Sequence, residues 1–196
     1  MAQCGLFLGG TRSGKSKLAE DTAEAWQLKY AGKVVYVATA EAQDDAMAER
    51  IRLHQQRRPL SWIVLEEPRQ LTQVLHNWDA PDTCILVDCL TLWLTNHLCQ
   101  CVNQAEAAIV ALVEQIKDLQ GQLLLVSNEV GSGIVPMGAL NRQFQDLSGI
   151  MNQQLAQVCD EVILVVAGLP MVLKAAAQPL VDGCEVNSRH SSELPS

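Results

Sequence analysis

The sequence lacks long apolar runs, an excess of positive charge and any pattern typical of an exported protein. No apolar run comes near the roughly 20 residues that a helix needs to cross a bilayer, so we expect no membrane span. Lysine and arginine number 14 against 22 acidic residues. The formal net charge of −8 argues against a nucleic-acid partner, which requires a basic surface. The first five residues lead directly into an apolar segment, so we expect no signal peptide.

The cysteines also lack a pattern that would indicate a metal site or a disulfide framework. There are seven, an odd number, with no C-x-x-C pair and no cysteine–histidine spacing of the metal-binding kind. Cys4 and Cys84 lie in apolar runs, where a free thiol behaves as a small hydrophobic group. Only Cys99 and Cys101 are close in sequence, and no other feature indicates redox chemistry there. We therefore expect reduced cysteines in a cytoplasmic protein.

What the chain does have is a regular alternation of short apolar segments and helical patterns. The segments are nearly continuous in hydrophobicity, which is typical of parallel strands covered on both faces. The pattern predicts strands at Cys4–Leu8, Val34–Ala38, Trp62–Leu65, Cys84–Val87, Leu123–Ser127 and Val162–Val166, with Met171–Leu173 as a further edge strand. It predicts helices at Lys15–Leu28, Asp44–Arg57, Pro68–Trp78, Thr91–Leu98, Ala105–Leu119 and Leu140–Val158. Such alternation predicts a doubly wound α/β fold with a mostly parallel sheet and ligands at the carboxyl ends of its strands.

Length and composition fit one folded domain. With 196 residues, 48% of them hydrophobic and 18% charged, the chain can bury a sizeable core. After Lys174 the residues become small and polar and lose their periodicity. We therefore expect a domain at residues 1–174 and a mobile tail at residues 175–196.

The most specific motif is G-x-x-x-x-G-K-[ST], completed by residues 9–16 between the first predicted strand and the first predicted helix. Backbone N–H groups of such a loop surround phosphate oxygens at the positive end of the helix dipole. We expect Lys15 to reach the β and γ phosphates and the Ser16 hydroxyl to coordinate Mg²⁺. An ordinary glycine-rich turn is the alternative, but a chance match seldom falls between a strand and a helix. The predicted nucleotide-binding residues here are Gly9, Gly10, Thr11, Arg12, Ser13, Gly14, Lys15 and Ser16.

Two acidic residues follow predicted strands and are candidates for holding the nucleotide or its metal ion. Asp88 comes directly after a fully apolar strand, where a carboxylate emerges at the ligand edge of the sheet. A purely structural role as the N-terminal cap of the next helix explains Asp88 almost as well. Glu66 ends another predicted strand and has weaker support from the pattern alone.

A histidine lies among arginines on the predicted helix at residues 44–57. Arg50, His54 and Arg58 are spaced four residues apart and therefore share one helix face. Guanidinium charges disfavour the imidazolium, so we expect a lowered pKa for His54 and a mostly neutral ring at pH 7. A neutral imidazole can attack phosphorus while arginines hold phosphate charge. Residue type alone, however, fits a solvated surface histidine at least as well.

Several segments taken together resemble one enzyme family. They are Gly9–Ser16, Tyr36–Ala40, Arg50–His54 with Arg57-Arg58-Pro59, Leu86–Thr91, Val126–Pro136, and the stretch around Arg142–Phe144, Gly149 and Asn152-Gln153. In this order they resemble the bifunctional adenosylcobinamide kinase / adenosylcobinamide-phosphate guanylyltransferase family of cobalamin biosynthesis. The resemblance spans residues 4 to about 174 and is most specific in the R-I-x-x-H and N-E-V-G-x-G-I-V-P motifs.

The resemblance implies two reactions. A nucleoside triphosphate, ATP or GTP, phosphorylates the hydroxyl of cobinamide, and GTP then transfers GMP to that phosphate through a guanylyl-histidine, releasing pyrophosphate. The family histidine falls on His54, and Asp88 with Ser16 is expected to hold Mg²⁺. Asn128 and Glu129, at a strand end, are candidates for the corrinoid pocket. The family also implies a RecA-like P-loop fold and a homotrimer. Beyond the loop, family nucleotide positions fall on Ala38, Thr39, Ala40, Gln55, Gln56, Arg57, Arg58, Glu66 and Asp88.

Two other functions remain open at the level of sequence. An ordinary P-loop small-molecule kinase would transfer only the γ phosphate and would form no covalent intermediate. A RecA-like regulatory ATPase would hydrolyse nucleotide in response to a protein partner and would ignore cobinamide. A covalent guanylate adduct distinguishes the bifunctional enzyme from both.

Overall fold

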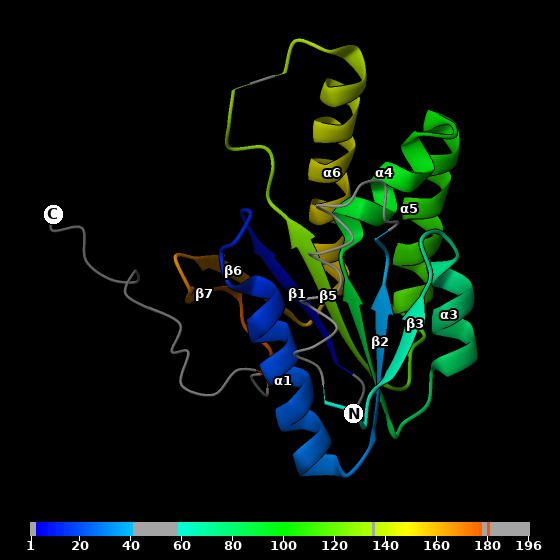
Figure 1. The fold of residues 1–196 in the computed structure, drawn as a ribbon, viewed down its shortest axis with the longest axis vertical. Coiled ribbons are helices and arrows are strands. Elements are labelled where there is room, and N and C mark those ends of the chain that lie inside the picture. The colour runs from blue at the N-terminus through cyan, green and yellow to red at the C-terminus, as the bar shows by residue number, and fades with distance from the viewer. Residues whose placement is uncertain (1–2, 41–58, 135, 178–179, 181–196) are drawn as a thin grey trace, which may run out of the picture.

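A seven-stranded sheet forms the centre of the computed structural model, which describes residues 3–40, 59–134, 136–177 and 180 (Figure 1). The strand order is β3-β2-β4-β5-β1-β6-β7. Every neighbouring pair is parallel except β6 and β7, which are antiparallel, so the predicted mostly parallel sheet is confirmed. The strands are β1 Cys4–Gly9, β2 Lys33–Ala38, β3 Ile63–Glu66, β4 Thr83–Asp88, β5 Gln122–Asn128, β6 Glu161–Val166 and β7 Leu169–Lys174.

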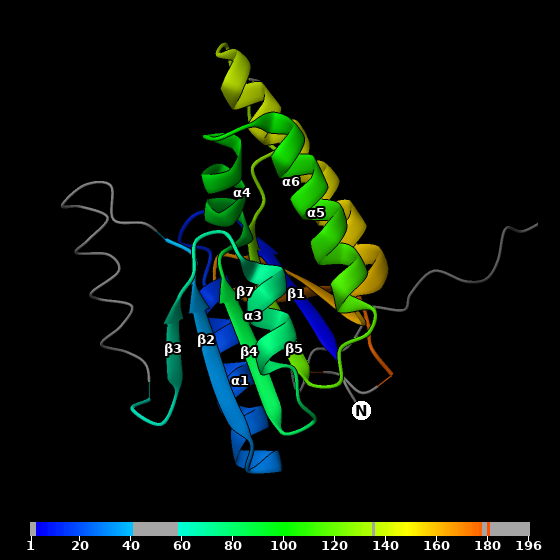
Figure 2. The same ribbon diagram turned by 90° about the vertical axis from the view of Figure 1, so that its right-hand side faces the viewer.

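Helices cover both faces of this sheet, as the doubly wound prediction requires. Helix α1 packs on one face, and α3, α4, α5 and α6 pack on the other (Figures 1 and 2). None of the described helices is long and apolar enough to cross a bilayer. The helix predicted at residues 44–57 lies outside the described residues. The helices are α1 Lys15–Tyr30, α3 Leu71–Trp78, α4 Leu90–Leu98, α5 Val102–Ile116 and α6 Ala139–Val158.

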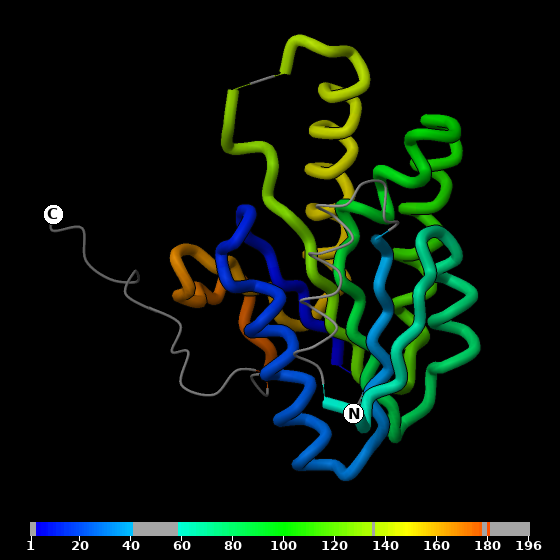
Figure 3. Tube along the Cα trace, viewed as in Figure 1, coloured from blue at the N-terminus to red at the C-terminus, as the bar shows by residue number. Residues whose placement is uncertain are grey.

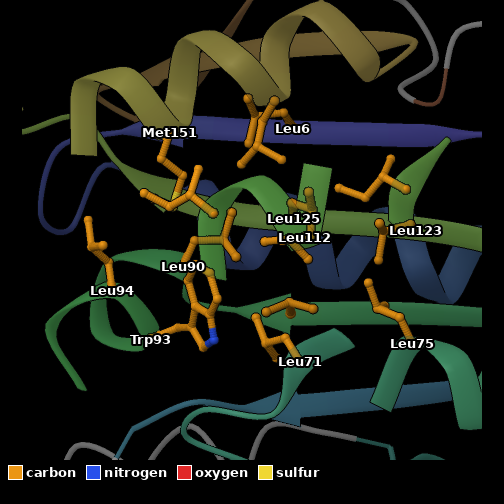
Figure 4. Close-up of a cluster of buried hydrophobic side chains, with 14 of the residues drawn as sticks. Leu6, Leu71, Leu75, Leu90, Trp93, Leu94, Leu112, Leu123, Leu125 and Met151 are labelled. Carbon is orange, nitrogen blue, oxygen red and sulfur yellow. The ribbon is translucent and has the colours of Figure 1, made fainter. Parts of the chain in front are cut away.

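The period of two along each strand explains why the core divides into two layers. In β1, Leu6 belongs to the layer beneath α3–α6, whereas Phe7 belongs to the layer beneath α1. In β5, Leu125 and Leu124 divide in the same way. Figure 4 shows part of the larger layer, in which leucines from strands and helices pack together with Met151 and Trp93. Each fully buried leucine stabilises the fold by about 1.5–3 kcal/mol relative to an exposed one, so continuous apolar strands are expected here.

Several predicted element boundaries were wrong. Helix α5 begins and ends three residues earlier than predicted, at Val102 and Ile116. At two other boundaries, local hydrogen bonds hold the chain in a turn. Trp62 precedes β3, its backbone N–H bonding to the carbonyl of Pro59 at 3.1 Å. Helix α3 begins at Leu71 and not at Pro68. The carboxylate of Glu67 accepts the N–H groups of Arg69 and Gln70 at 3.0 and 2.8 Å and holds them in a turn before the helix.

The predicted edge strand is confirmed and is longer than expected, as β7 spans Leu169–Lys174. It joins β6 through the two-residue turn Ala167-Gly168, whose φ angles are 53° and 80°. Two consecutive residues with positive φ are the signature of a tight hairpin turn that matches the twist of the strands. Beyond β7, Leu180 packs against the layer beneath α1, and its N–H donates to Glu161 Oε2 at 2.9 Å. The division of the chain at residue 174 stays a prediction, because residues 181–196 lie outside the described ranges.

Candidate functional site

The carboxyl edge of the sheet gathers several of the polar residues singled out in the sequence. Strand register places Gly9 of β1 beside Asn128 of β5, Asp88 of β4 beside Ala38 of β2, and Ala38 beside Glu66 of β3. Five neighbouring strands therefore end at one site, and the loop at residues 9–16 leaves it from β1 toward α1. Figure 3 traces this loop and the long connection from β5 to α6 that rises beside it.

The loop conformation depends on the first and last glycines of its motif. A Cβ at Gly9 would lie 2.5 Å from both Ser13 Oγ and the carbonyl oxygen of Val165, so no larger residue fits. Gly14 has a φ of 100°, which glycine adopts without strain, and it forms the N-cap of α1. The loop is closed by hydrogen bonds from Ser13 N–H to Gly10 at 3.2 Å and from Gly168 N–H to Ser13 at 2.8 Å.

Side chains of this loop are arranged as a phosphate site requires. Lys15 is only 6% exposed, and its Nζ donates to the Gly10 carbonyl at 3.0 Å, so its cation is folded over the loop. The Ser13 hydroxyl is buried and has no hydrogen-bond partner among the described residues. A buried hydroxyl without a partner is costly, and a phosphate oxygen would supply the missing bond. Ser16 lies half-buried in the first turn of α1, which contains no acidic residue to repel phosphate.

Asp88 lies at the end of β4, and one of its two carboxylate oxygens accepts a hydrogen bond. Its Oδ2 accepts a hydrogen bond from the Tyr36 hydroxyl at 2.9 Å, whereas Oδ1 makes no hydrogen bond with the described residues. The peptide that joins Asp88 to Cys89 is cis. Cys89 is the N-cap residue of α4 but makes no side-chain capping bond there, its Sγ lying instead 3.1 Å from Thr91 Oγ1, and Asp88 itself caps no described helix. Asp88 Oδ1 and the Ser16 hydroxyl are hard oxygen donors, which suit Mg²⁺.

The remaining predicted residues at the end of β2 and β3 differ in exposure. Thr39 is fully buried, and its hydroxyl both accepts from Cys89 N–H at 2.9 Å and donates to the Cys89 carbonyl at 2.7 Å. Ala40 is half-buried and Glu66 is exposed, so both can face a ligand at this edge. His54, Gln55, Gln56, Arg57 and Arg58 lie outside the described residues.

A polar network beside the loop was not singled out from the sequence as a unit. Asn128 Nδ2 donates to Thr91 Oγ1 at 2.9 Å, which joins the end of β5 to the first turn of α4. Asn152 of α6 bonds both to Ser127, which donates to its Oδ1 at 2.8 Å, and to the Asn128 carbonyl. The only sequence signal was the clustering of amide and hydroxyl residues after an apolar strand. Their pairing depends on three elements that are far apart in the chain.

Other reactive groups near the edge are unsuited to covalent chemistry. Burial, followed by the charge of Asp88, raises the pKa of the Cys89 thiol, so Cys89 stays a neutral thiol at neutral pH. At the opposite, amino end of β4, burial likewise raises the pKa of Cys84 far above its ordinary value. Among the described residues no three histidine, cysteine or acidic side chains come together as a metal cluster. A divalent ion here would therefore depend on Asp88, a loop hydroxyl and the phosphates themselves.

The sequence is similar to a known protein family and to several of its members. A family model described as cobinamide kinase / cobinamide phosphate guanyltransferase matches residues 5–173. The bifunctional adenosylcobalamin biosynthesis protein CobP of Pseudomonas aeruginosa is 47% identical over 170 residues, which cover 86% of this chain and 96% of that protein. The bifunctional adenosylcobalamin biosynthesis protein CobU of Escherichia coli is 37% identical over 183 residues, covering 86% of this chain and 98% of that protein. The CobU of Salmonella typhimurium is 39% identical with the same coverage.

A solved structure supports the fold alone. This structure, an ATPase domain, superposes with a TM-score of 0.53 and covers 90% of this chain and 78% of that one, at 13% sequence identity. The similarity confirms the predicted RecA-like α/β fold, a mostly parallel sheet flanked by helices. At such low identity it says nothing about substrate.

Proposed function

The chain belongs to the cobinamide kinase / cobinamide phosphate guanyltransferase family, and on that premise we propose how its residues divide the two reactions. It is a bifunctional enzyme of adenosylcobalamin biosynthesis with cobinamide kinase and cobinamide phosphate guanylyltransferase activities. The observation that best supports a single nucleotide site is the register that brings Gly9, Asp88 and Glu66 to one edge of the sheet.

We propose that the triphosphate of ATP or GTP lies in the loop at residues 9–16. The backbone N–H groups and the Lys15 ammonium would bind the β and γ phosphates, and the Ser13 hydroxyl would gain the partner that it lacks among the described residues. These donors are already in place before the reaction, so they can stabilise charge as it develops on the leaving group. Ala40 and Glu66, which are half-buried and exposed at the same edge, are proposed to contact the nucleoside, and the buried Ala38 and Thr39 are proposed to shape that part of the site without touching it.

Ser16 and Asp88 are proposed to hold Mg²⁺ between them and the phosphates. When bound, the ion would neutralise phosphate charge and orient the triphosphate. The Oδ1 of Asp88 and the half-buried Ser16 hydroxyl are suitable oxygen donors for it.

In the kinase reaction, the cobinamide hydroxyl attacks the γ phosphorus, and the bond between that phosphorus and the bridging oxygen breaks to release a nucleoside diphosphate. In the guanylyl reaction, we propose that a neutral His54 nitrogen attacks the α phosphorus of GTP and expels pyrophosphate. The cobinamide phosphate oxygen then attacks the same phosphorus and breaks the nitrogen–phosphorus bond. Two displacements of moderate difficulty replace one that would join two phosphates directly.

The decisive experiment detects the covalent intermediate. Enzyme incubated with Mg²⁺ and GTP labelled at the α phosphate should acquire one acid-labile, base-stable guanylate, and His54→Ala should abolish the label. His76→Ala is the matched control, because His76 is an exposed helical histidine of α3, and it should keep the label. Persistent label in His54→Ala would rule out the assigned nucleophile.

Nucleotide binding must be measured in the same variants. A fluorescent GTP analogue should bind His54→Ala with nearly the affinity of the unchanged enzyme, because the loop holds the phosphates. Loss of both binding and label would mean that the variant is misfolded, and His54→Asn, which keeps the size and polarity of the side chain, then repeats the test.

A homotrimer and a cytoplasmic location complete the proposal. Large apolar side chains of the β5–α6 connection support an assembly, because Ile134 and Met137 are 98% and 96% exposed in the single chain. Light scattering of the purified protein measures the assembly directly. Six free cysteines among the described residues support a reducing compartment.

A further inference from the structure

We propose that Tyr36 of β2 and Thr39, which directly follows that strand, are positioning residues that fix Asp88 for the divalent cation. This inference rests on the proposed metal role of Asp88. The phosphate-loop motif says nothing about this role. According to the inference, the affinity of the site for the cation depends on how firmly residues of and beside β2 hold the Asp88 carboxylate.

The first support is the hydrogen bond from the Tyr36 hydroxyl to Asp88 Oδ2 at 2.9 Å. Tyr36 is 1% exposed and pairs with Leu86, whereas Asp88 pairs with Ala38 two residues further along. Because residues two apart on a strand share a face, the side chains of Tyr36 and Asp88 lie on the same face of the sheet. A carboxylate with one oxygen fixed loses most of its rotational freedom. Oδ1 is then the oxygen left for a cation, since it makes no hydrogen bond with any described residue.

The second support is that Tyr36 is itself held from the helix that follows the phosphate loop. Its ring stacks on Trp62 with centroids 6.4 Å apart and planes inclined by 23°. Trp62 Nε1 in turn donates to Gln27 Oε1 on α1 at 3.1 Å. Because α1 begins with Lys15 and Ser16, these contacts connect one proposed metal ligand, Ser16, to the other, Asp88. The distance between the two ligands is thus constrained by side chains that bind neither metal nor nucleotide.

The third support is the set of hydrogen bonds by which Thr39 holds the backbone of Asp88 and Cys89. The Thr39 hydroxyl accepts from the Cys89 N–H and donates to the Cys89 carbonyl, and the Thr39 N–H donates to the Asp88 carbonyl at 3.3 Å. The Thr39 carbonyl accepts from Asn96 Nδ2 of α4 at 2.9 Å. All polar groups of this fully buried threonine are therefore used inside the protein. Its hydroxyl acts on the turn after Asp88, while the neighbouring Ala40 remains the residue of this segment that can meet a nucleotide.

Groups that orient a metal ligand typically change metal affinity roughly 10- to 100-fold when they are removed. We therefore expect Tyr36→Phe, which removes only the hydroxyl, to raise the Mg²⁺ concentration for half-maximal effect by about 10-fold. Thr39→Val should act in the same direction, and Thr39→Ser, which keeps the hydroxyl, should restore the behaviour of the unchanged enzyme. A residue that merely stabilises the fold would lower the unfolding temperature without moving the Mg²⁺ dependence.

The test is a Mg²⁺ titration of the binding of a fluorescent GTP analogue, with the affinity in EDTA as the reference. Tyr30→Phe is the matched control, because Tyr30 ends α1 and is 55% exposed, and it should titrate like the unchanged enzyme. We expect Tyr36→Phe and Thr39→Val to bind the analogue normally in EDTA and to require more Mg²⁺ for the same tightening. Kinase and guanylyl rates are measured at both low and saturating Mg²⁺.

Asp88→Asn separates failure of this inference from failure of the proposed metal role. If Asp88→Asn titrates normally, Asp88 does not hold the ion and the proposed role itself is wrong. If Asp88→Asn loses the Mg²⁺ response but Tyr36→Phe and Thr39→Val titrate normally, the acid binds the metal without help from β2 and the inference is overturned. Should Tyr36→Phe not fold, the pair Thr39→Val and Thr39→Ser decides the question alone.

Discussion

At the amino edge of the sheet, the carboxylates of Asp79 and Asp160 accept hydrogen bonds from backbone N–H groups. At the carboxyl edge, the carboxylate of Asp88 accepts one from a tyrosine hydroxyl. Asp79 accepts from Gln120 and Gly121 at 2.8–3.0 Å, and Asp160 accepts from Cys4 at 2.7 Å. Asp88 accepts from Tyr36 through one oxygen. Residues of one type thus differ in role because of what they bond to.

The lysines show the same contrast. Lys174 donates to the carbonyls of Ala156 and Gln157 at 3.2 and 3.1 Å and so caps the end of α6. Lys15 donates to its own loop at Gly10, in a position that a phosphate can share. Charged side chains at the amino edge stabilise the fold, whereas those at the carboxyl edge lie where a ligand can bind. Substitutions at the two edges should therefore separate stability from activity.

The largest effect is expected from Lys15→Ala. Removing a cation directed at developing phosphate charge should lower kcat/KM of both reactions by on the order of 10² to 10³, the range for loss of one preorganised donor. Urea unfolding should change far less than the rates, because the hydrogen bond from Lys15 Nζ to Gly10 lies within one loop. Steady-state kinetics and unfolding of the same preparation measure both. If Lys15→Ala lowered the free energy of unfolding but kept both rates, Lys15 would serve stability and not activity, contrary to the contrast between the two edges.

The opposite pattern is expected from Asp79→Ala at the amino edge. Two backbone N–H groups lose a charged acceptor, which should lower the free energy of unfolding by about 1–3 kcal/mol. Both catalytic rates should remain unchanged under conditions where the variant is folded. Asp79→Asn is the matched control, since it keeps one acceptor oxygen and should be intermediate. Lowered kcat/KM with unaltered stability would contradict the structural role of this edge.

The smallest effect concerns Glu161, which begins β6 at the amino edge. Burial raises the pKa of its carboxyl above the ordinary value of 4.5, partly offset by the bond from Leu180 N–H. The folded protein therefore binds this proton more tightly than the unfolded chain, and stability is lost as the pH rises through the folded pKa. Glu161→Gln cannot ionise, so its free energy of unfolding at pH 7 should be higher by up to about 0.5 kcal/mol.

The pH dependence makes that prediction specific. The difference between Glu161→Gln and the unchanged protein should disappear below pH 4.5, where the glutamate is protonated in both folded and unfolded states. Chemical denaturation at a series of pH values measures it. A difference that stays constant across pH would indicate a packing effect and no contribution from ionisation.

Much of the fold was predictable because its signals are local. Continuous apolar strands such as Cys84–Val87 can be buried only between two layers of helices, and the loop at residues 9–16 carries its own strand–turn–helix signature. The boundary errors at Trp62 and Pro68 also have local causes, in a turn and a carboxylate bond that periodicity does not encode. Assignment of a role to His54 stays a prediction, because that residue lies outside the described ranges.

The partners of Asp88 could not be predicted, because they depend on strand order. Tyr36 reaches Asp88 since β2 pairs with β4, which follows it only after β3 and α3. Strand β5 then inserts between β4 and β1, so that Asn128 lies beside the phosphate loop. No periodicity in one sequence specifies which strands become neighbours.

The amino-acid sequence by itself determined where the phosphate loop forms, which residues enter the core and which acid ends a buried strand, because each follows from short-range spacing and burial. Only the tertiary structure decided that Tyr36 and Thr39 hold that acid, that Thr91 binds Asn128, and that Asp79 closes a loop. Those bonds join residues brought together by the packing of distant elements, and a hydrogen bond specifies a partner only when the two atoms meet at bonding distance.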